Sequence, residues 1–163
     1  MHRNILAKLA EIQTTESVRI LYACESGSRA WGFASQDSDY DVRFIYVRHP
    51  EWHFSIEPGR DVIECPIVNE IDCNGWDLRK ALRLLRKSNP PLLECLNSPI
   101  VYRKIPVVVE DLRRLVAISF RPASSAYHYL RIVQRNFRTY LHEDPVWLKN
   151  IFMCCARCWP CNG

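Results

Sequence analysis

The chain has 163 residues, of which 48% are hydrophobic and 25% are charged. Both fractions are ordinary for a globular protein, and the length suits a single domain of about 100–200 residues. Ten prolines and only five glycines exclude a collagen-like or low-complexity chain, and no apolar stretch reaches the roughly 18–20 residues of a membrane span. The net charge of +4 is compatible with phosphate-bearing partners but is too small to predict nucleic-acid binding by itself. We therefore expect a soluble protein with one core.

The N-terminal residues lack the uninterrupted apolar core of a secretory signal, because Lys8 and Glu11 fall within the amphipathic pattern. The cytoplasm is therefore the expected location, and the eight cysteines are expected to be reduced thiols. Four of them stand singly among apolar residues and should behave as small buried hydrophobic side chains: Cys24, Cys65, Cys73 and Cys95.

Hydrophobic periodicity predicts the regular elements of the first part of the chain. An amphipathic helix is expected over residues 2–13, followed by a strand over residues 18–23 and a second strand over residues 39–47. Between the two strands, the pair Gly27 and Ser28 breaks the pattern and is expected to open one or two helical turns.

The rest of the chain is predicted to continue with two short strands over residues 61–65 and 68–73. Asn74 is a suitable N-cap for the next helix, which should run to about Ser88 and end before two prolines. Further helices are predicted over residues 92–96, 110–118 and 124–140. Strands come first and helices afterwards, which indicates an α+β domain whose sheet is covered by helices.

Asp39 and Asp41 stand at the start of the second predicted strand, separated by one residue. Alternate strand residues face the same side, so the two carboxylates should project together. A divalent cation commonly relieves the repulsion between such neighbours, and the turn at Gly27 and Ser28 offers backbone N–H groups and a hydroxyl to a phosphate. The combination predicts a site for a metal and a triphosphate. For the aspartate pair alone, a turn followed by a solvated strand residue is the simpler interpretation.

These motifs resemble the nucleotidyltransferase superfamily that includes DNA polymerase β, in which a hydrophobic strand is followed by Gly-Ser, a short spacer and Asp-x-Asp. In this chain the ten residues 29–38 separate Ser28 from Asp39. Three stretches look like a bacterial family of predicted nucleotidyltransferases: Gly-Ser-Arg-Ala-Trp-Gly-Phe-Ala-Ser from residue 27, Ser-Asp-Tyr-Asp-Val-Arg from residue 38 and Gly-Trp-Asp-Leu-Arg-Lys from residue 75. The resemblance covers residues 18–148.

The resemblance implies a polymerase β-like fold, with a mixed β-sheet covered by helices and followed by a helical segment. It implies a Mg²⁺-dependent enzyme that moves a nucleoside monophosphate from an NTP, expected to be ATP, to a hydroxyl acceptor and releases pyrophosphate. The acceptor is an RNA end, a protein or a small molecule. Asp39 and Asp41 would be the first two catalytic and metal-binding carboxylates, and Asp72 is the candidate for the third, with Glu70 as its rival. Nucleotide binding would fall to three consecutive residues: Gly27, Ser28 and Arg29.

Several cationic residues leave alternatives open. Arg43 shares the strand alternation of Asp39 and Asp41, so it can pair with them, with phosphate, or in a structural salt bridge. The cations of the helix after residue 74 are more typical of a solvated face than of a nucleic-acid contact. The helix over residues 124–140 interleaves tyrosines with arginines, a composition that weakly favours RNA.

The chain is predicted to comprise a catalytic domain over residues 1–105, an incomplete helical segment over residues 106–149 and a Cys-rich tail over residues 150–163. The four cysteines of the tail offer thiolates, but no spacer separates two pairs as in common zinc sites. Read in a shifted frame, the codons after Lys149 allow an amphipathic continuation, so the tail is expected to be out of frame. The alternative function is then a catalytically inactive, truncated nucleotide- or RNA-binding module.

Overall fold

The computed structural model describes residues 1–140 except positions 33, 36, 37, 57 and 58. The Cys-rich tail, and with it the predicted out-of-frame ending, lies outside the described residues. The chain divides into two compact units, Met1–Phe120 and Arg121–Gly163. In the second unit the described element is the helix α5 (Pro122–Tyr140). The functional division after residue 105 stays a prediction.

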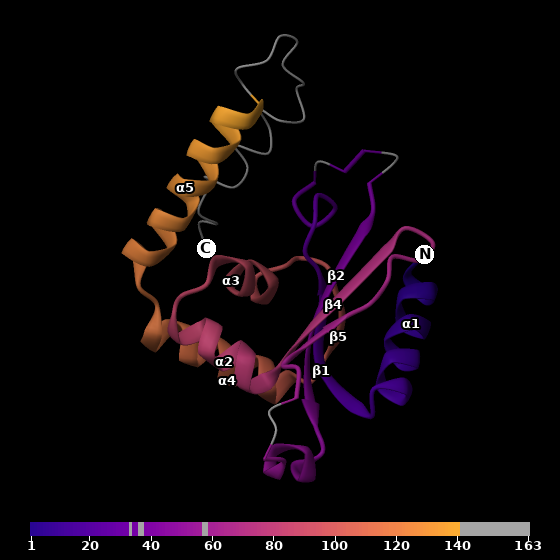
Figure 1. Cartoon of the computed structure of the whole chain (residues 1–163). Helices are drawn as coiled ribbons and strands as arrows, with labels where there is room; N and C mark the ends of the chain where they lie inside the picture. Colours follow the sequence, from indigo (N-terminus) through magenta and orange to yellow (C-terminus); the bar gives the residue numbers. More distant parts are fainter. Residues whose placement is uncertain (33, 36–37, 57–58, 141–163) are drawn as a thin grey trace. The chain divides into compact units, whose positions relative to one another are not determined.

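A mixed five-stranded sheet with the strand order β3-β4-β2-β1-β5 forms the centre of the first unit (Figure 1). Its strands are β1 (Val18–Glu25), β2 (Tyr40–Arg48), β3 (Val62–Glu64), β4 (Ile71–Asp77) and β5 (Val101–Lys104). The central pair β2 and β4 is parallel, whereas the other neighbouring strands are antiparallel. The predicted α+β class with a mixed sheet is confirmed.

Helices cover both faces of this sheet. On one side lies α1 (His2–Thr15), and the other side carries α2 (Leu78–Arg86), α3 (Pro90–Leu96) and α4 (Pro106–Ser119), as Figure 1 shows. A short 3-10 helix, η1 (Pro50–Phe54), lies in the connection between β2 and β3. Within the described residues, no helix combines the length and the apolar character that a membrane span needs.

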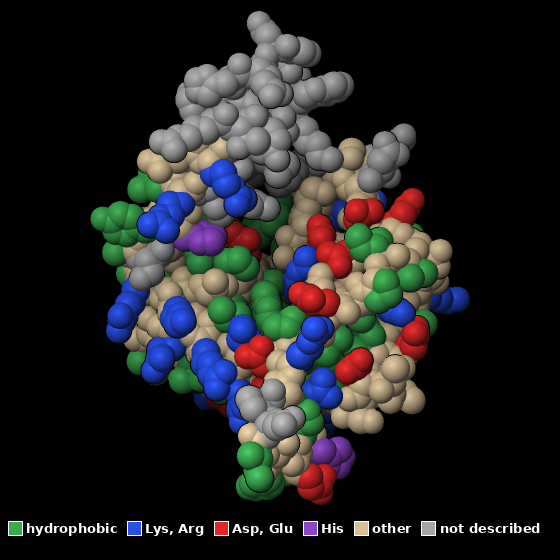
Figure 2. Space-filling model, in the orientation of Figure 1, with side chains coloured by type: hydrophobic (Ala, Val, Ile, Leu, Met, Phe, Trp, Pro, Cys, Tyr) green, Lys and Arg blue, Asp and Glu red, His purple; other side chains and the backbone are tan. Residues whose placement is uncertain are grey.

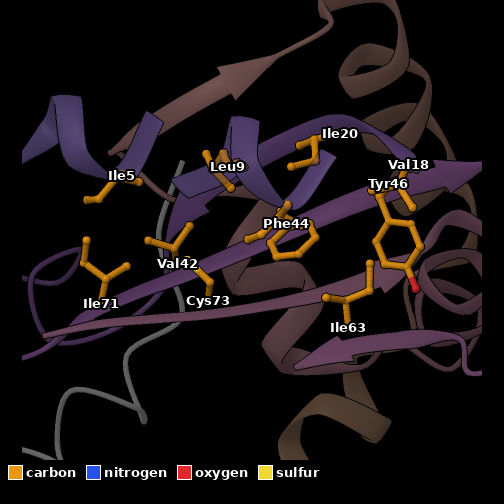
Figure 3. Packing of buried hydrophobic residues seen from close by; sticks show 12 residues of the cluster. Ile5, Leu9, Val18, Ile20, Val42, Phe44, Tyr46, Ile63, Ile71 and Cys73 are labelled. Carbon is orange, nitrogen blue, oxygen red and sulfur yellow. The ribbon is translucent and has the colours of Figure 1, made fainter. Parts of the chain in front are cut away.

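The buried side chains of β2 are divided between two hydrophobic cores, one on each face of the sheet. Val42, Phe44 and Tyr46 are buried against α1, together with Ile5 and Leu9 of that helix (Figure 3). Ile45 belongs instead to the core beneath the helices α2, α3 and α4. Since successive strand residues point to opposite faces, Asp41 and Arg43 lie on the same side of the sheet as Ile45.

The structure corrects the predicted junction between β4 and α2. Asn74 is not the N-cap of the helix; the strand continues through Asp77, whose carboxylate accepts a hydrogen bond from the Arg79 backbone N–H at 2.8 Å. The reason is tertiary, because parallel pairing with β2 holds the backbone extended as far as Asp77, opposite Tyr46.

Two further boundaries differ from the prediction. The edge strand β5 was not predicted, because its four residues between Pro99 and Pro106 are too few for a periodic signal. Helix α4 begins at Pro106 rather than at Glu110, with the proline in the first turn, where its missing N–H costs no hydrogen bond. The four described cysteines are free thiols. Three of them are buried as expected, Cys24, Cys73 and Cys95, whereas Cys65 is only partly buried, so the prediction is wrong at that position.

Gly75 permits the close pairing of β2 and β4. A Cβ atom at this position would lie 2.1 Å from Cε2 of the Phe44 ring. We therefore expect Gly75→Ala to lower the free energy of unfolding by about 1–3 kcal/mol, the usual cost of overpacking a core, measured by urea denaturation of the full chain. Phe44→Leu should relieve the clash, so the loss caused by Gly75→Ala should shrink in the Phe44→Leu background. Strictly additive losses would contradict this packing account.

Candidate active site

Two carboxylates face each other across the parallel pair of strands. Asp41 on β2 is in register with Asp72 on β4, and their side chains are 35% and 20% exposed. Burial raises the pKa of the Asp41 carboxyl above its ordinary value; Arg43 lowers it, whereas Asp72, among other carboxylates, raises it further. Asp39 is exposed and directly precedes β2. The structure therefore brings Asp41 and Asp72 together, with Asp39 in the chain directly before the strand that carries Asp41.

Arg43 lies between Asp41 and Asp72. Its Nη2 atom is 3.1 Å from Asp72 Oδ2 and 3.6 Å from Asp41 Oδ1, and its Nη1 donates to Asp72 Oδ2 at 3.2 Å. The remaining Asp72 oxygen, Oδ1, accepts a hydrogen bond from the Asn74 side-chain amide at 2.7 Å. Arg43 is thus paired with Asp41, one of the two partners that the strand alternation suggested, and more closely with Asp72, which the alternation did not suggest.

Glu70, the rival for the third carboxylate, does not lie on the strand. It sits in the turn before β4, with a φ of +63°, after Asn69 with a φ of +52°. Glu70 was a candidate because residues two apart on a strand share a face, as Glu70 and Asp72 would. The two left-handed residues interrupt this alternation, and the Glu70 side chain is exposed. Its backbone carbonyl accepts a hydrogen bond from the Tyr40 N–H at 2.7 Å. The geometry favours Asp72, although a catalytic role for either residue stays a prediction.

The Gly27 backbone packs directly against the Asp41 side chain. A Cβ atom on Gly27 would lie 1.9 Å from Asp41 Oδ2, so only glycine allows this approach. The predicted helical turns after Gly27 are wrong in detail: the Ala30 N–H donates to the Gly27 carbonyl and the Trp31 N–H to the Ser28 carbonyl, which closes a tight turn without a regular helix. Phosphate binding there cannot draw on a helix dipole and would depend on the local N–H and hydroxyl groups of the turn.

Arg29 follows this turn and ties it to the beginning of β2. Its Nη2 donates to the Ser38 carbonyl at 2.6 Å, and its guanidinium carbon lies 3.9 Å from the centroid of the Tyr40 ring. Tyr40 packs against the core on the α1 side, whereas Asp41 faces the other side of the sheet. A phosphate contact by Arg29 stays a prediction, and in this structure the guanidinium is engaged by Ser38 and Tyr40.

Glu25 is a site residue that the sequence analysis missed. It ends β1 with a side chain that is 0% exposed, and its Oε1 accepts a hydrogen bond from the Asp41 backbone N–H at 2.8 Å. The other oxygen, Oε2, accepts from the Tyr102 hydroxyl at 2.5 Å, and burial followed by this hydrogen bond raises the pKa of Tyr102. One feature of the sequence could have identified Glu25: it is an acidic residue that ends an apolar strand just before the Gly-Ser turn.

The donor set suits a hard divalent cation, since Asp39, Asp41 and Asp72 present carboxylate oxygens of the kind that Mg²⁺ prefers. Gly27, whose missing side chain leaves room for the Asp41 carboxylate, is consistent with such a site. In the part of the chain that the structure describes, no three ligating side chains are already arranged around a common point. Arg43 compensates the negative charge instead. Figure 2 shows acidic and basic side chains intermingled near the middle of the face that it presents.

Two of the cations on α2 have structural partners. Lys80 Nζ lies 3.4 Å from Asp61 Oδ1, and Arg83 Nη1 lies 3.7 Å from Asp61 Oδ2. These pairs connect α2 to the chain just before β3. They agree with the interpretation of the row as an ordinary charged face.

Comparisons with known proteins agree with the sequence motifs. The model of the RlaP family, described as "RNA repair pathway DNA polymerase beta family", matches residues 1–155. The chain is also 54% identical over 152 residues to the uncharacterized protein YcgL of Bacillus subtilis (strain 168). This similarity covers 93% of the chain but 58% of that relative, so the chain spans less than two thirds of the length of the curated protein it matches. No solved structure matches the chain significantly.

The hydroxyl of the half-buried Tyr102 should contribute more to stability than the hydroxyl of Tyr22, although Tyr22 is the more deeply buried residue. Tyr102→Phe removes a donor from the buried Glu25 carboxylate and should cost about 1.5–3 kcal/mol of unfolding free energy, because bonds to charged groups are the stronger ones. Tyr22→Phe is the matched control: its hydroxyl donates to the neutral Cys95 carbonyl at 2.7 Å, and the loss should be about 0.5–1.5 kcal/mol. Urea denaturation of both variants measures the two losses of unfolding free energy. Equal losses would contradict a stronger hydrogen bond from Tyr102 to Glu25.

Proposed function

Because the chain belongs to the RlaP family, the RNA repair pathway DNA polymerase β family, we propose that it is a nucleotidyltransferase that moves a nucleoside monophosphate from an NTP, with ATP as the expected donor, to the hydroxyl end of an RNA. Pyrophosphate is the second product. Membership of a polymerase β-like family supports the reaction class. The RNA acceptor rests on the family description and on the side chains of α5 discussed below.

One observation carries the proposal: Asp41 and Asp72 face each other on adjacent parallel strands, with Asp39 at the start of the same strand as Asp41. Neighbouring carboxylates that are partly withdrawn from water are costly unless a positive charge is supplied. In a nucleotidyltransferase, such carboxylates would bind the divalent cation that also binds the phosphates of the nucleotide.

Each group of residues would have its own task. Gly27 and Ser28 would hold the triphosphate through backbone N–H groups of the turn and the Ser28 hydroxyl. Asp39, Asp41 and Asp72 would hold Mg²⁺. When bound, the ion would neutralise the charge that develops on the leaving pyrophosphate and would lower the pKa of the acceptor hydroxyl. Glu25 would keep the backbone of Asp41 in place through its hydrogen bond to the Asp41 N–H. No covalent intermediate on the protein is needed.

Helix α5 supports RNA as the acceptor. Tyr127, Arg131 and Arg135 follow one another at intervals of four residues, so they share one helical face, and all three are exposed. Tyrosines that stack on bases and arginines that neutralise phosphates are the common means of binding single-stranded RNA. A protein or a small molecule as the acceptor is an outcome that the test below separates.

The test is transfer of label from α-³²P-labelled ATP, with Mg²⁺, in parallel reactions that contain RNA, protein or neither. Asp39→Asn, Asp41→Asn and Asp72→Asn should each lower transfer to RNA by about 10²-fold or more, since each removes a charge from the reacting centre. Glu70→Gln is the matched control, because Glu70 lies in the neighbouring turn and not on β4, and it should keep activity within about threefold.

Other outcomes have distinct meanings. Label on protein would support the proposed transfer reaction but would show that the acceptor is a protein and not RNA. If Glu70→Gln loses activity while Asp72→Asn keeps it, Glu70 and not Asp72 is the third carboxylate of the site. If the parent chain binds ATP but transfers no label to any acceptor, the proposal fails in favour of the inactive nucleotide- or RNA-binding module.

A further inference from the structure

Arg43 occupies the position between the two carboxylates that the proposed function assigns to a cation. Two N–H groups of its guanidinium converge on Asp72 Oδ2, at 3.1 Å and 3.2 Å, and Asp41 Oδ1 lies 3.6 Å from Nη2. Arg43 is two positions after Asp41 on β2, so its side chain leaves the same face of the strand. The side chain is 23% exposed, so water screens these contacts only in part.

Asp72 has little capacity left for a further partner in this arrangement. Arg43 uses both lone pairs of Oδ2, and Asn74 donates to Oδ1 at 2.7 Å. Of the two Asp41 oxygens, Oδ1 lies beside Arg43, whereas Oδ2 lies against Gly27. A cation that bridges Asp41 and Asp72 would therefore meet the guanidinium at the same place.

We propose that Arg43 is a resident counter-ion of the site: it competes with the divalent cation for Asp41 and Asp72, and when the cation binds, the released guanidinium pairs with a phosphate of the nucleotide. The inference rests on the proposed function for the identity of the site. A guanidinium matches the two oxygens of a phosphate as well as those of a carboxylate, so the exchange keeps Arg43 paired in both states.

The exchange couples cation binding to nucleotide binding. Without phosphate, loading the cation breaks the contacts of Arg43 and leaves its charge beside the cation. With a triphosphate present, the guanidinium has an anionic partner and the cation gains phosphate oxygens. Arg43 would thus weaken binding of the cation alone and strengthen binding of the nucleotide, a reciprocal effect of one residue on two ligands.

Arg48 provides a matched control on the same strand. Its Nη2 lies 3.4 Å from Glu16 Oε2, its Nη1 donates to the Glu16 carbonyl at 3.0 Å, and its side chain is 15% exposed. Arg48 is thus a part-buried arginine in an ion pair at the far end of β2, away from the carboxylates of the site. Removing it should affect stability without affecting cation affinity.

The experiment measures Mn²⁺ binding to the full chain in the absence of nucleotide, from the electron paramagnetic resonance signal of free Mn²⁺. Arg43→Gln should bind Mn²⁺ at least about tenfold more tightly than the parent chain, because a unit charge a few ångströms from the cation is removed. Arg43→Lys, which keeps the charge, and Arg48→Gln should stay within about threefold of the parent. Circular dichroism verifies that each variant is folded, and Arg43→Met, which is uncharged and similar in length, replaces Arg43→Gln in the comparison if Arg43→Gln does not fold.

The second readout is the affinity for a fluorescent ATP analogue in the presence of Mg²⁺. Arg43→Gln should weaken it by at least about fivefold, the loss of a charge-assisted contact to phosphate, whereas Arg48→Gln should not. An Mn²⁺ affinity that Arg43→Gln leaves unchanged, including no detectable binding by either protein, overturns the competition. Tighter Mn²⁺ binding with unchanged affinity for the ATP analogue overturns the transfer of Arg43 to phosphate.

Failure of this inference can be told from failure of the proposed function. If the chain transfers label to RNA but Arg43→Gln does not change its Mn²⁺ affinity, only the counter-ion role is wrong. If Arg43→Gln tightens Mn²⁺ binding but the parent chain transfers no label to any acceptor, the counter-ion role stands and the proposed function is contradicted.

Discussion

The parallel pairing of β2 with β4 is the constraint on which the rest of the molecule depends. It sets Asp41 opposite Asp72 and thereby brings two carboxylates together in partly buried positions. Such a pair is unfavourable without compensating charge, and Arg43, fixed on the same strand face, supplies it at 3.1 Å and 3.6 Å. The same pairing holds β4 extended through Asp77, which decides where α2 begins. One set of backbone hydrogen bonds therefore governs both the site and the placement of a covering helix.

Support for the site comes from both sides of the sheet. On the α1 side, the buried Glu25 carboxyl accepts hydrogen bonds from the Asp41 backbone and from Tyr102 on the edge strand β5. On the other side, the Gly27 backbone lies against the Asp41 carboxylate, an approach that any Cβ atom would prevent. The Ser26 N–H also donates to the Asp41 carbonyl at 2.8 Å. Asp41 is thus held by its backbone while its carboxylate stays partly exposed, as a group that binds ligands requires.

Much of the fold was predictable because its signals are local. The apolar spacing of α1 and the β-branched runs of β1 and β2 each identify an element without any neighbour. Where the prediction was wrong, a neighbour decided the outcome. Asn74 has the chemistry of an N-cap, yet pairing with β2 keeps it in a strand. The strand β5 has four residues and exists because β1 offers an edge for it to pair with.

The sequence by itself determined the motif that identifies the family: the Gly27-Ser28 pair and the aspartates at positions 39 and 41 are close enough in the chain to be recognised together. The tertiary structure decided which distant groups join them. That Asp72 lies opposite Asp41 while Glu70 lies in the turn depends on strand register and on two left-handed residues before β4. That Glu25 lies beneath the site and Arg43 between its carboxylates depends on burial and charge compensation. These forces act between residues far apart in the chain, such as Arg43 and Asp72 or Glu25 and Tyr102, so a local pattern of residues can suggest a role for Glu25 or Arg43 but cannot identify these partners.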